Sequence, residues 1–390
     1  MTRYDTRAGI PRFSGTSRLA SGIAGLAIVP ALTSVPRFAK VPRLANLPKI
    51  GGLVLAAAVA FGLAGPAAAQ QTSFGSFEPP AGWLPPPLDP TGVQLQTHEL
   101  APGVYALLST RPPVDNSGFI VGENGVLVVD AHINGTMARQ IQAAVRAVTD
   151  KPILYLVNTN YHGDHTFGNY AFPAETKIVA QRETAAAMRD FEQEKALLLP
   201  AVNGNAAVFD GVRLRLPDVT FEQSLSLDLG GRVVELHHFG PGNTAGDTVV
   251  YVPEAKAAWT GNLILGAGSI PWAIEGNTQA YLETVARVAA RLDIETIVGG
   301  HILTTPGETL GHYFDYLSGQ INSVRRAVGA GKTLEQTLAD LPLEEIYLPP
   351  ADSPLAGVRP VMQGFHLWNV KRTYQELKTQ ERAAQQAMVQ

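Results

Sequence analysis

The residues best suited to chemistry form the short motif His162-Gly-Asp164-His165, which places two imidazoles and one carboxylate within four positions. The motif closely follows an apolar run, 153–157, so it falls where a predicted strand passes into a loop. At such a junction the backbone can direct neighbouring side chains towards one point. Imidazole and carboxylate groups together suit Zn²⁺ or a similar divalent ion. The alternative is a polar loop whose histidines cap a helix.

Three later segments agree with a metal site. They are Pro241-Gly-Asn243-Thr-Ala-Gly-Asp247, Thr260-Gly-Asn262 and Gly300-His301. In this order, after Asn160-Tyr-His162-Gly-Asp164-His165, they resemble the metallo-β-lactamase superfamily, whose motifs are His-x-His-x-Asp-His, Gly-x-His, an Asp after Thr-Gly, and Gly-His. The resemblance covers about residues 93–305. It implies an α/β fold of the αββα sandwich type.

The chain departs from that pattern at three positions. Asn160 and Asn243 stand where the superfamily has ligand histidines of its first metal site, so the resemblance implies that this site holds no metal. The second site is retained, with Asn262 in place of its bridging aspartate. The resemblance therefore implies one Zn²⁺ per chain, with the ligands Asp164, His165, Asn262 and His301. An open position for water beside the protein ligands is typical of catalytic sites and not of structural ones.

This ligand order is similar to that of chlorothalonil hydrolytic dehalogenases, which use Asp, His, Asn and His around a single zinc. The resemblance implies a hydrolase whose metal-activated water attacks an electron-poor carbon, such as the C–Cl carbon of a chlorinated aromatic nitrile. Such a metal can lower the pKa of water to about 7. Two alternatives stay open. One is hydrolysis of a lactone, a β-lactam or another cyclic ester or amide, and the other is a non-catalytic binding protein on a degenerate site.

We expect His162 and Asp164 to be the catalytic residues, Asp164 as a ligand of the activating metal and His162 as a general base or substrate-orienting group beside it. His162 is otherwise a remnant of the lost metal site. Asn160 and Asn243 are expected to face substrate as neutral groups, unless they bond to their own backbone. Trp272 is expected to form a pocket wall for a flat apolar substrate, or else to belong to the core.

Two further residues lie at the end of the apolar run 125–129. Asp130 is expected to orient a ligand histidine from outside the metal site. His132 is at the right strand edge to reach the site, and the alternative is that it does not touch it.

The elements that position these residues alternate between strands and helices. Strands are predicted at 104–109, 118–121, 125–130, 152–158, 257–260 and 296–298, with several short ones within 218–252; helices are predicted at 136–148, 182–196 and 278–291. We predict one domain over 93–390, with C-terminal helices from about 307 packed outside the sheets. The proline-rich residues 70–92 are predicted to be an extended lead-in.

Residues 1–69 have the pattern of an N-terminal extension and secretory signal peptide. Eight basic residues precede an uncharged apolar stretch that ends at Ala67-Ala68-Ala69. This stretch is shorter than the ~20 apolar residues that a membrane span needs. We expect cleavage after Ala69 and a periplasmic or secreted protein.

Composition limits the partners of the mature chain. Residues 1–69 contain eight of the 30 basic residues and one of the 34 acidic ones, so the net charge changes from −4 to −11 on cleavage. An acidic exported protein is a poor partner for nucleic acid or for an anionic membrane. The chain has no cysteine, which excludes disulfides, thiolate ligands and cysteine nucleophiles. We expect a small-molecule substrate, no nucleic acid and no stable membrane association; a homodimer is left open.

Overall fold

The computed structural model describes residues 78–389 except 82, 84 and 276. The predicted signal peptide and residues 70–77 of the lead-in lie outside the described residues. The described residues belong to one compact unit, Ala69–Gln390. Among them, no helix combines the length and the apolar character that crossing a membrane requires.

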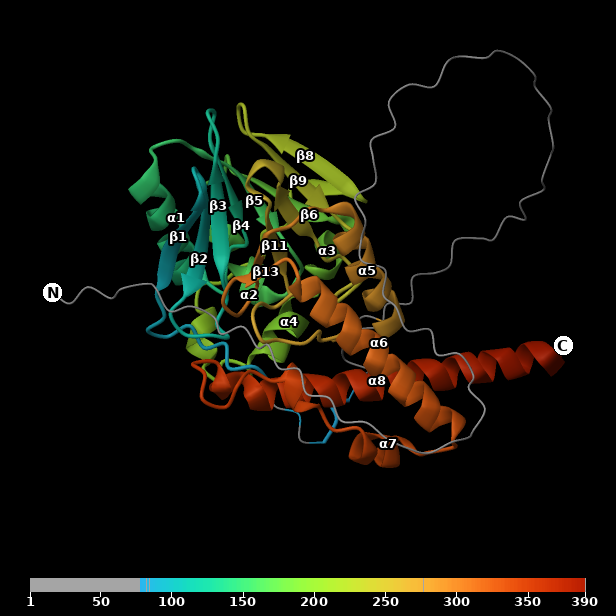
Figure 1. The fold of residues 1–390 in the computed structure, drawn as a ribbon. Helices are drawn as coiled ribbons and strands as arrows, with labels where there is room; N and C mark the ends of the chain where they lie inside the picture. The colour runs from blue at the N-terminus through green and yellow to red at the C-terminus, as the bar shows by residue number, and fades with distance from the viewer. Residues whose placement is uncertain (1–77, 82, 84, 276, 390) are drawn as a thin grey trace, which may run out of the picture. The chain divides into compact units, whose positions relative to one another are not determined.

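Two β-sheets form the centre of the fold (Figure 1). The first sheet has the strand order β1-β2-β3-β4-β5-β6-β7, and the second has the order β13-β12-β11-β10-β9-β8. The strands of the first sheet are β1 (Leu95–Ala101), β2 (Val104–Ser109), β3 (Ser117–Val121), β4 (Val126–Val129), β5 (Ile153–Asn158), β6 (Lys177–Gln181) and β7 (Val219–Phe221). Those of the second are β8 (Ser224–Asp228), β9 (Val233–His237), β10 (Val249–Val252), β11 (Ala257–Gly261), β12 (Thr296–Gly299) and β13 (Thr305–Pro306).

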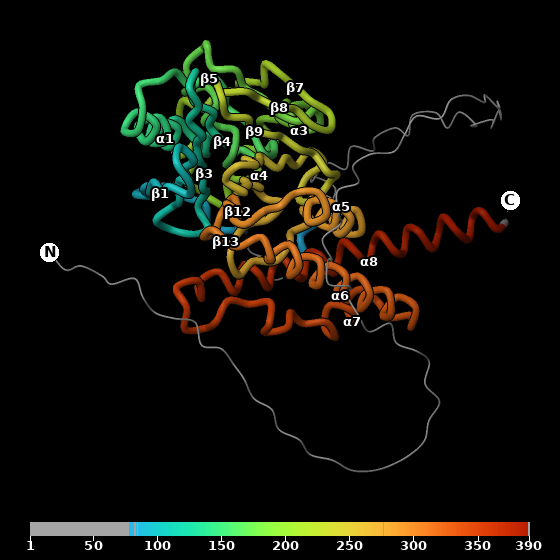
Figure 2. Tube along the Cα trace, turned by 45° about the horizontal axis from the view of Figure 1, so that its top comes forward, coloured from blue at the N-terminus to red at the C-terminus, as the bar shows by residue number. Residues whose placement is uncertain are grey.

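The helices flank these sheets. They are α1 (Gly135–Val148), α2 (Gly163–Thr166), α3 (Arg182–Ala187), α4 (Phe191–Leu198), α5 (Thr278–Arg291), α6 (Thr309–Gly329), α7 (Leu334–Asp340) and α8 (Arg359–Val389). The last three lie together, as Figure 2 shows, and pack against one another. The sequence predicts a single helix over 182–196, whereas the structure divides this segment into α3 and α4.

Strand β4 shows why the sandwich has buried layers on both sides of a sheet. All four of its residues are apolar and buried. Leu127 and Val129 point into the core between the two sheets, while Val126 and Val128 pack against α1. Successive strand residues face opposite sides, so an uninterrupted apolar run suits a strand that is covered on both faces.

The opposite layer is built in the same way. Val250 and Val298 of the second sheet face the core between the sheets. Their neighbours Val249 and Ile297 pack with residues of α5, α6 and α8, including the fully buried Trp368. The order of layers is helix, sheet, sheet, helix. This confirms the predicted αββα sandwich and the C-terminal helical region.

Candidate metal centre and cavity

The candidate site lies where several strands of both sheets end. Strands β4 and β5 are parallel neighbours, as are β11 and β12, so the carboxyl ends of each pair lie at the same edge. The segments that follow these strands carry Asp130, Asp164 and His165 from the first sheet, and Asn262 and His301 from the second. All five residues are buried, with exposed fractions of 7% or less.

The Asn262 loop needs a glycine before it. Gly261 has a φ of +50°, a conformation that L side chains adopt rarely, and a Cβ there would lie 2.1 Å from the hydroxyl of Thr159. Because Gly261 has no side chain, β11 can end against the loop that follows β5. This contact brings Asn262 of the second sheet close to the site residues that follow the first sheet.

Four ligand-type atoms converge at this edge. The Asn262 Oδ1 atom lies 3.0 Å from Nε2 of His165 and 2.7 Å from Nε2 of His301. Oδ2 of Asp164 lies 3.7 Å from the same His301 nitrogen. The structure thus brings together the four residues that the sequence predicts as ligands. Asp164 Oδ1 is buried and has no hydrogen-bond partner among the described residues.

The Nδ1 atoms of His165 and His301 point away from this group of atoms and contact residues around it. Nδ1 of His165 donates to Asp130 Oδ2 at 2.8 Å, and Asp130 also accepts hydrogen bonds from the backbone and hydroxyl of Thr159. The predicted contact of Asp130 with a ligand-type histidine is therefore present. Asp130 itself has a φ of +59°, an unusual backbone conformation that Asp tolerates better than most residues.

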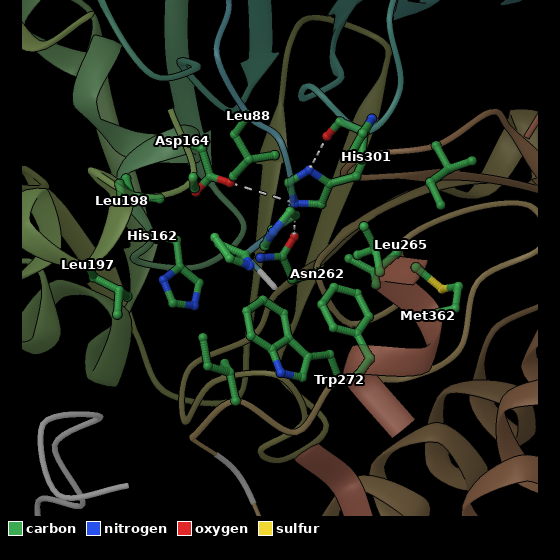
Figure 3. Close-up of a pocket in the computed structure, with 18 of the residues that line it drawn as sticks. Leu88, His162, Asp164, Leu197, Leu198, Asn262, Leu265, Trp272, His301 and Met362 are labelled. Atoms are coloured by element: carbon green, nitrogen blue, oxygen red, sulfur yellow. Dashed lines mark hydrogen bonds and ion pairs between the residues drawn. The ribbon is translucent and has the colours of Figure 1, made fainter. Parts of the chain in front are cut away.

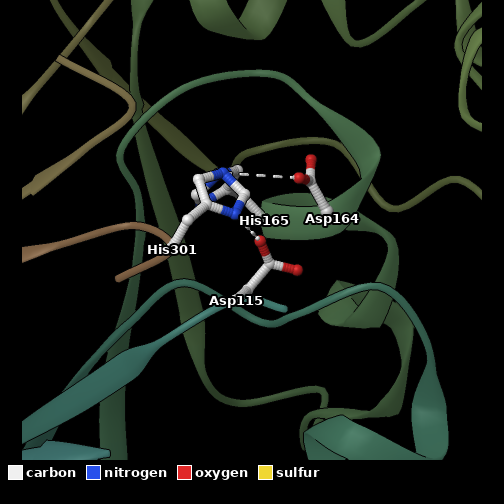
Figure 4. A group of neighbouring side chains, drawn as sticks. All are labelled: Asp115, Asp164, His165 and His301. Carbon is white, nitrogen blue, oxygen red and sulfur yellow. Dashed lines mark ion pairs between the residues drawn. The ribbon is translucent and has the colours of Figure 1, made fainter. Parts of the chain in front are cut away.

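His301 has a matching partner that sequence analysis missed. Its Nδ1 lies 2.9 Å from Asp115 Oδ1 and 2.8 Å from the carbonyl oxygen of Pro113. Asp115 comes from the loop between β2 and β3 and is fully buried. Ligand atoms of Asp115, Asp164, His165 and His301 all lie within 4.8 Å of one another, and Figure 4 shows the ion pairs of the His301 ring with both carboxylates. The one signal in the sequence is a polar Asp115-Asn116 pair between two apolar strands.

His132 supports this loop without joining the group. Its Nδ1 accepts the backbone N–H of Ile133, so its Nε2 carries the hydrogen and donates to the carbonyl oxygen of Asp115 at 3.2 Å. Burial lowers the pKa of His132 to about 3. The ring is therefore neutral at pH 7 and acts as a hydrogen-bonded support for Asp115.

The electrostatics of the group favour a bound cation. Burial opposes a charge on His165, but Asp130 and Asp164 raise its pKa to about 10. Burial and the nearby Asp164 together raise the pKa of Asp115 to about 7. Both shifts reflect excess negative charge in a water-poor environment. Positive charge is needed there, and protons or a metal ion can supply it.

His162 lies beside the group and faces another way. Its Nδ1 is 3.0 Å from Glu194 Oε1 on α4, and its Nε2 is buried with no partner among the described residues. Burial lowers the pKa of His162, but Glu194 more than offsets this and raises it to about 9. Glu194 gave no signal in the sequence, because a glutamate on a predicted helix resembles a solvent-exposed residue.

The remaining predicted residues divide into two kinds. Trp272 lines the cavity next to the site. Asn160 and Asn243 are fully buried and neither lines this cavity. Asn160 Oδ1 accepts the backbone N–H of His162, and Asn243 Nδ2 donates to the carbonyl oxygen of Trp272. Both amides thus make the backbone contacts that were the alternative for these residues, and their contact with a substrate stays a prediction.

The cavity beside the site has about 660 Å³ of empty space, part of it open to solvent. All but four of its lining residues are apolar, and the four polar ones are His162, Asp164, Asn262 and His301. Figure 3 shows these four side chains near one another, with Trp272 and Met362 on the other side of the cavity. Residues of the lead-in also line it, namely Trp83, Pro85, Pro86 and Leu88. The sequence predicts only an extended segment there.

Comparison with known proteins adds the family. Residues 111–301 match the family model of the metallo-beta-lactamase superfamily. A metallo-beta-lactamase from Pontibacter korlensis is 18% identical over 58% of this chain and 99% of its own, with a TM-score of 0.47. The stereoselective inverting sec-alkylsulfatase Pisa1 from Pseudomonas sp. is 15% identical over 72% of this chain, with a TM-score of 0.55. The match spans half of the alkylsulfatase, and at this identity it shows the fold alone.

Proposed function

We propose that this chain, whose residues 111–301 match the family model of the metallo-β-lactamase superfamily, is a hydrolase that depends on a single divalent ion, Zn²⁺ by preference. The proposed ligands are Asp164 Oδ2, His165 Nε2, Asn262 Oδ1 and His301 Nε2. The observation that carries the proposal is the chemistry of these four atoms. Because Nδ1 of His165 donates to Asp130 and Nδ1 of His301 donates to the carbonyl oxygen of Pro113 beside Asp115, two imidazole Nε2 atoms, an amide oxygen and a carboxylate oxygen meet at one place.

A set of acceptors like this fits a cation and is unfavourable without one. Two neutral imidazoles, an amide and one carboxylate match the ligand types of zinc. When bound, such an ion supplies Lewis acidity and makes water a nucleophile near neutral pH. The protein's own residues supply the rest, namely orientation, proton transfer and a binding surface.

His162 is the proposed acid–base group. It lines the cavity together with Asp164 and His301, and it is not needed as a ligand. From this position it can take a proton from the attacking water or give one to a leaving group. Asp130 and Asp115 hold the ligand histidines in orientation, as carboxylates beside ligand histidines do in metal sites generally.

The proposed substrate is a small, largely apolar molecule with an electron-poor carbon. The support is the apolar lining of the cavity around one polar edge, since apolar lining with few placed polar groups is typical of small-molecule sites. A chlorinated aromatic nitrile, which would lose chloride to water, is the first candidate. A lactone, a β-lactam or another cyclic ester or amide is the second, and the fold of the superfamily accommodates it.

Metal content per chain tests the proposal first. We expect about one zinc per chain by elemental analysis of the protein purified from Gln70 onwards, and almost none in Asp164→Ala or His301→Ala. The matched control is His312→Ala, because His312 is an exposed histidine of α6. Two equally occupied metals would contradict a single site. No metal after addition of zinc would favour a binding protein.

Turnover is the second test. The loaded protein is screened against chlorinated aromatic nitriles, lactones, β-lactams and secondary alkyl sulfates, with release of chloride, acid or sulfate as the signal. With the substrate found, His162→Ala is expected to keep its zinc and to lower kcat by about 10²- to 10⁴-fold, the usual contribution of an acid–base group. Full activity of this variant would remove His162 from the mechanism.

A further inference from the structure

We propose that Glu194 is a positioning residue that holds the His162 ring in one orientation and one tautomer, so that Nε2 is presented to a molecule bound in the cavity. The proposal rests on the proposed function in one respect, since it assumes that His162 acts on a bound substrate. It assigns a role to a helix that lies outside the metal-binding motifs.

One oxygen of Glu194 makes both contacts. Oε1 lies 3.0 Å from Nδ1 of His162 and accepts the backbone N–H of Gly163, also at 3.0 Å. A carboxylate has no hydrogen to give, so Nδ1 must carry the hydrogen of this bond. This holds for the neutral ring and for the protonated ring alike. Nε2 is therefore the ring nitrogen left to interact with a molecule in the cavity.

The environment of Nε2 points to a ligand. His162 and Glu194 are only 4% and 6% exposed, and Nε2 has no hydrogen-bond partner among the described residues. A buried polar atom without a partner costs free energy. Buried polar atoms in a protein core therefore almost always have a hydrogen-bond partner. In a binding site, a polar atom of the ligand can be that partner. His162 lines the same cavity as Asp164 and His301, so the missing partner belongs to a molecule bound there.

Helix α4 couples this arrangement to the shape of the cavity. Glu194 lies three and four positions before Leu197 and Leu198, which places these side chains on neighbouring positions of one helical face. Both leucines line the cavity. The second contact of Glu194, to Gly163, fixes the helix against the residue just before Asp164. One short helix thus orients His162 and forms part of the substrate wall.

Histidine-selective ¹⁵N NMR on the zinc-loaded protein tests the tautomer directly. The signal of His162 is assigned by its loss in His162→Gln, and spectra are recorded at a pH where the ring is neutral. We expect hydrogen on Nδ1 and none on Nε2. In Glu194→Ala we expect the Nε2–H tautomer to appear. A wild-type ring with hydrogen on Nε2 would overturn the proposal without the use of any Glu194 variant.

Kinetics supply the second measurement. We expect Glu194→Ala to lower kcat at least tenfold, with KM within about twofold and zinc content unchanged, and to remain less severe than loss of the acid–base group itself. Glu194→Gln should restore the tautomer and much of kcat, because its amide oxygen can accept both hydrogen bonds. The matched control is Glu192→Gln, which changes an exposed glutamate of the same helix.

The two proposals fail in different ways. Wild-type kcat and an unchanged tautomer in Glu194→Ala would overturn the positioning role and leave the hydrolase intact. Absence of zinc or of any turnover would overturn the hydrolase, while the spectrum of the wild-type ring would still report whether Glu194 sets the tautomer.

Discussion

At the candidate metal centre, His165 and His301 each have one nitrogen directed inwards and the other beside a buried carboxylate. His165 is held by Asp130 and His301 by Asp115, although the two carboxylates come from different loops. Such outer carboxylates fix the tautomer of a ligand histidine and increase its basicity. They also add negative charge that a cation offsets. Both proposed ligand histidines thus have a carboxylate beside Nδ1, even though the sequence motifs around them differ.

Asp115→Asn tests this outer support. Asn keeps the size of the Asp115 side chain and leaves the hydrogen bond of His301 Nδ1 to the carbonyl oxygen of Pro113 in place, but the negative charge beside His301 is lost. We therefore expect the affinity for zinc to fall by about 10- to 100-fold, measured by competition with a chelator. Asp150→Asn is the control, because Asp150 is exposed. An affinity equal to that of the wild type would show that the Asp115 charge does not act on the metal.

At the level of helices and strands, the contact between α5 and α8 carries a buried carboxylate of its own. Glu376 on α8 accepts hydrogen bonds from the backbone and the hydroxyl of Thr278, the first residue of α5. These bonds satisfy a helix N-terminus whose N–H groups lack partners within the helix. Burial nevertheless raises the pKa of Glu376 from 4.5 to about 7. The junction is therefore sensitive to pH.

The sign of this sensitivity follows from linkage. The folded state holds the Glu376 proton more tightly than the unfolded state, so its contribution to stability is complete below about pH 4.5 and is lost as the pH rises through about 7. Within this window the free energy of unfolding should fall by up to about 1.4 kcal/mol per pH unit from this group. Glu376→Gln should remove that slope.

Urea unfolding at several pH values between about 5 and 8 measures the effect. The quantity to compare is the difference between variant and wild type, because other buried groups contribute to both curves. Glu335→Gln, at an exposed position of α7, is the control. Parallel curves for wild type and Glu376→Gln would contradict the assigned pKa.

Across the molecule, the cavity is assembled from segments that are far apart in the chain. The lead-in contributes Trp83, and helix α4 contributes Leu197 and Leu198. The C-terminal helix α8 contributes Val361, Met362 and Phe365. Trp83 contacts Trp272 and Trp368, with ring centroids 6.1 Å and 5.4 Å apart. These contacts fix the lead-in against α8 and close one side of the cavity.

Trp83→Ala is expected to weaken binding of apolar molecules and to leave the zinc content unchanged, because Trp83 lines the cavity away from the ligand atoms. Loss of one aromatic wall should reduce affinity about twofold to tenfold. The Kd of the apolar dye anilinonaphthalene sulfonate measures this before a substrate is known. Phe314→Ala is the control, because Phe314 is 41% exposed on α6. Equal dye affinity in both variants would exclude Trp83 from the binding surface.

Much of the metal centre could be predicted from the sequence because its signals are local. His162-Gly-Asp164-His165 closely follows an apolar strand, and Gly300-His301 directly follows another. Residue type and position at a strand end are visible in one short segment, and parallel strands bring such ends to the same edge. The apolar run of β4 likewise indicates a strand that is buried on both faces. The αββα fold and the grouping of four ligand-type residues were implied by the resemblance of these motifs, in this order, to the metallo-β-lactamase superfamily.

The residues around the centre depended on the tertiary structure. Asp115 meets His301 across 186 positions of the chain, Glu194 meets His162 across 32, and Trp83 meets Trp272 across 189. Each looks ordinary in its own segment, since a loop aspartate, a helix glutamate and a tryptophan after prolines have many uses. Asn160 and Asn243 stand in conspicuous motif positions, but a position in a motif does not reveal which way the amide of the side chain points. Spacing along the chain specifies neither the direction of a side chain nor its distant neighbours, which are decided when the two sheets, α4 and α8 pack together.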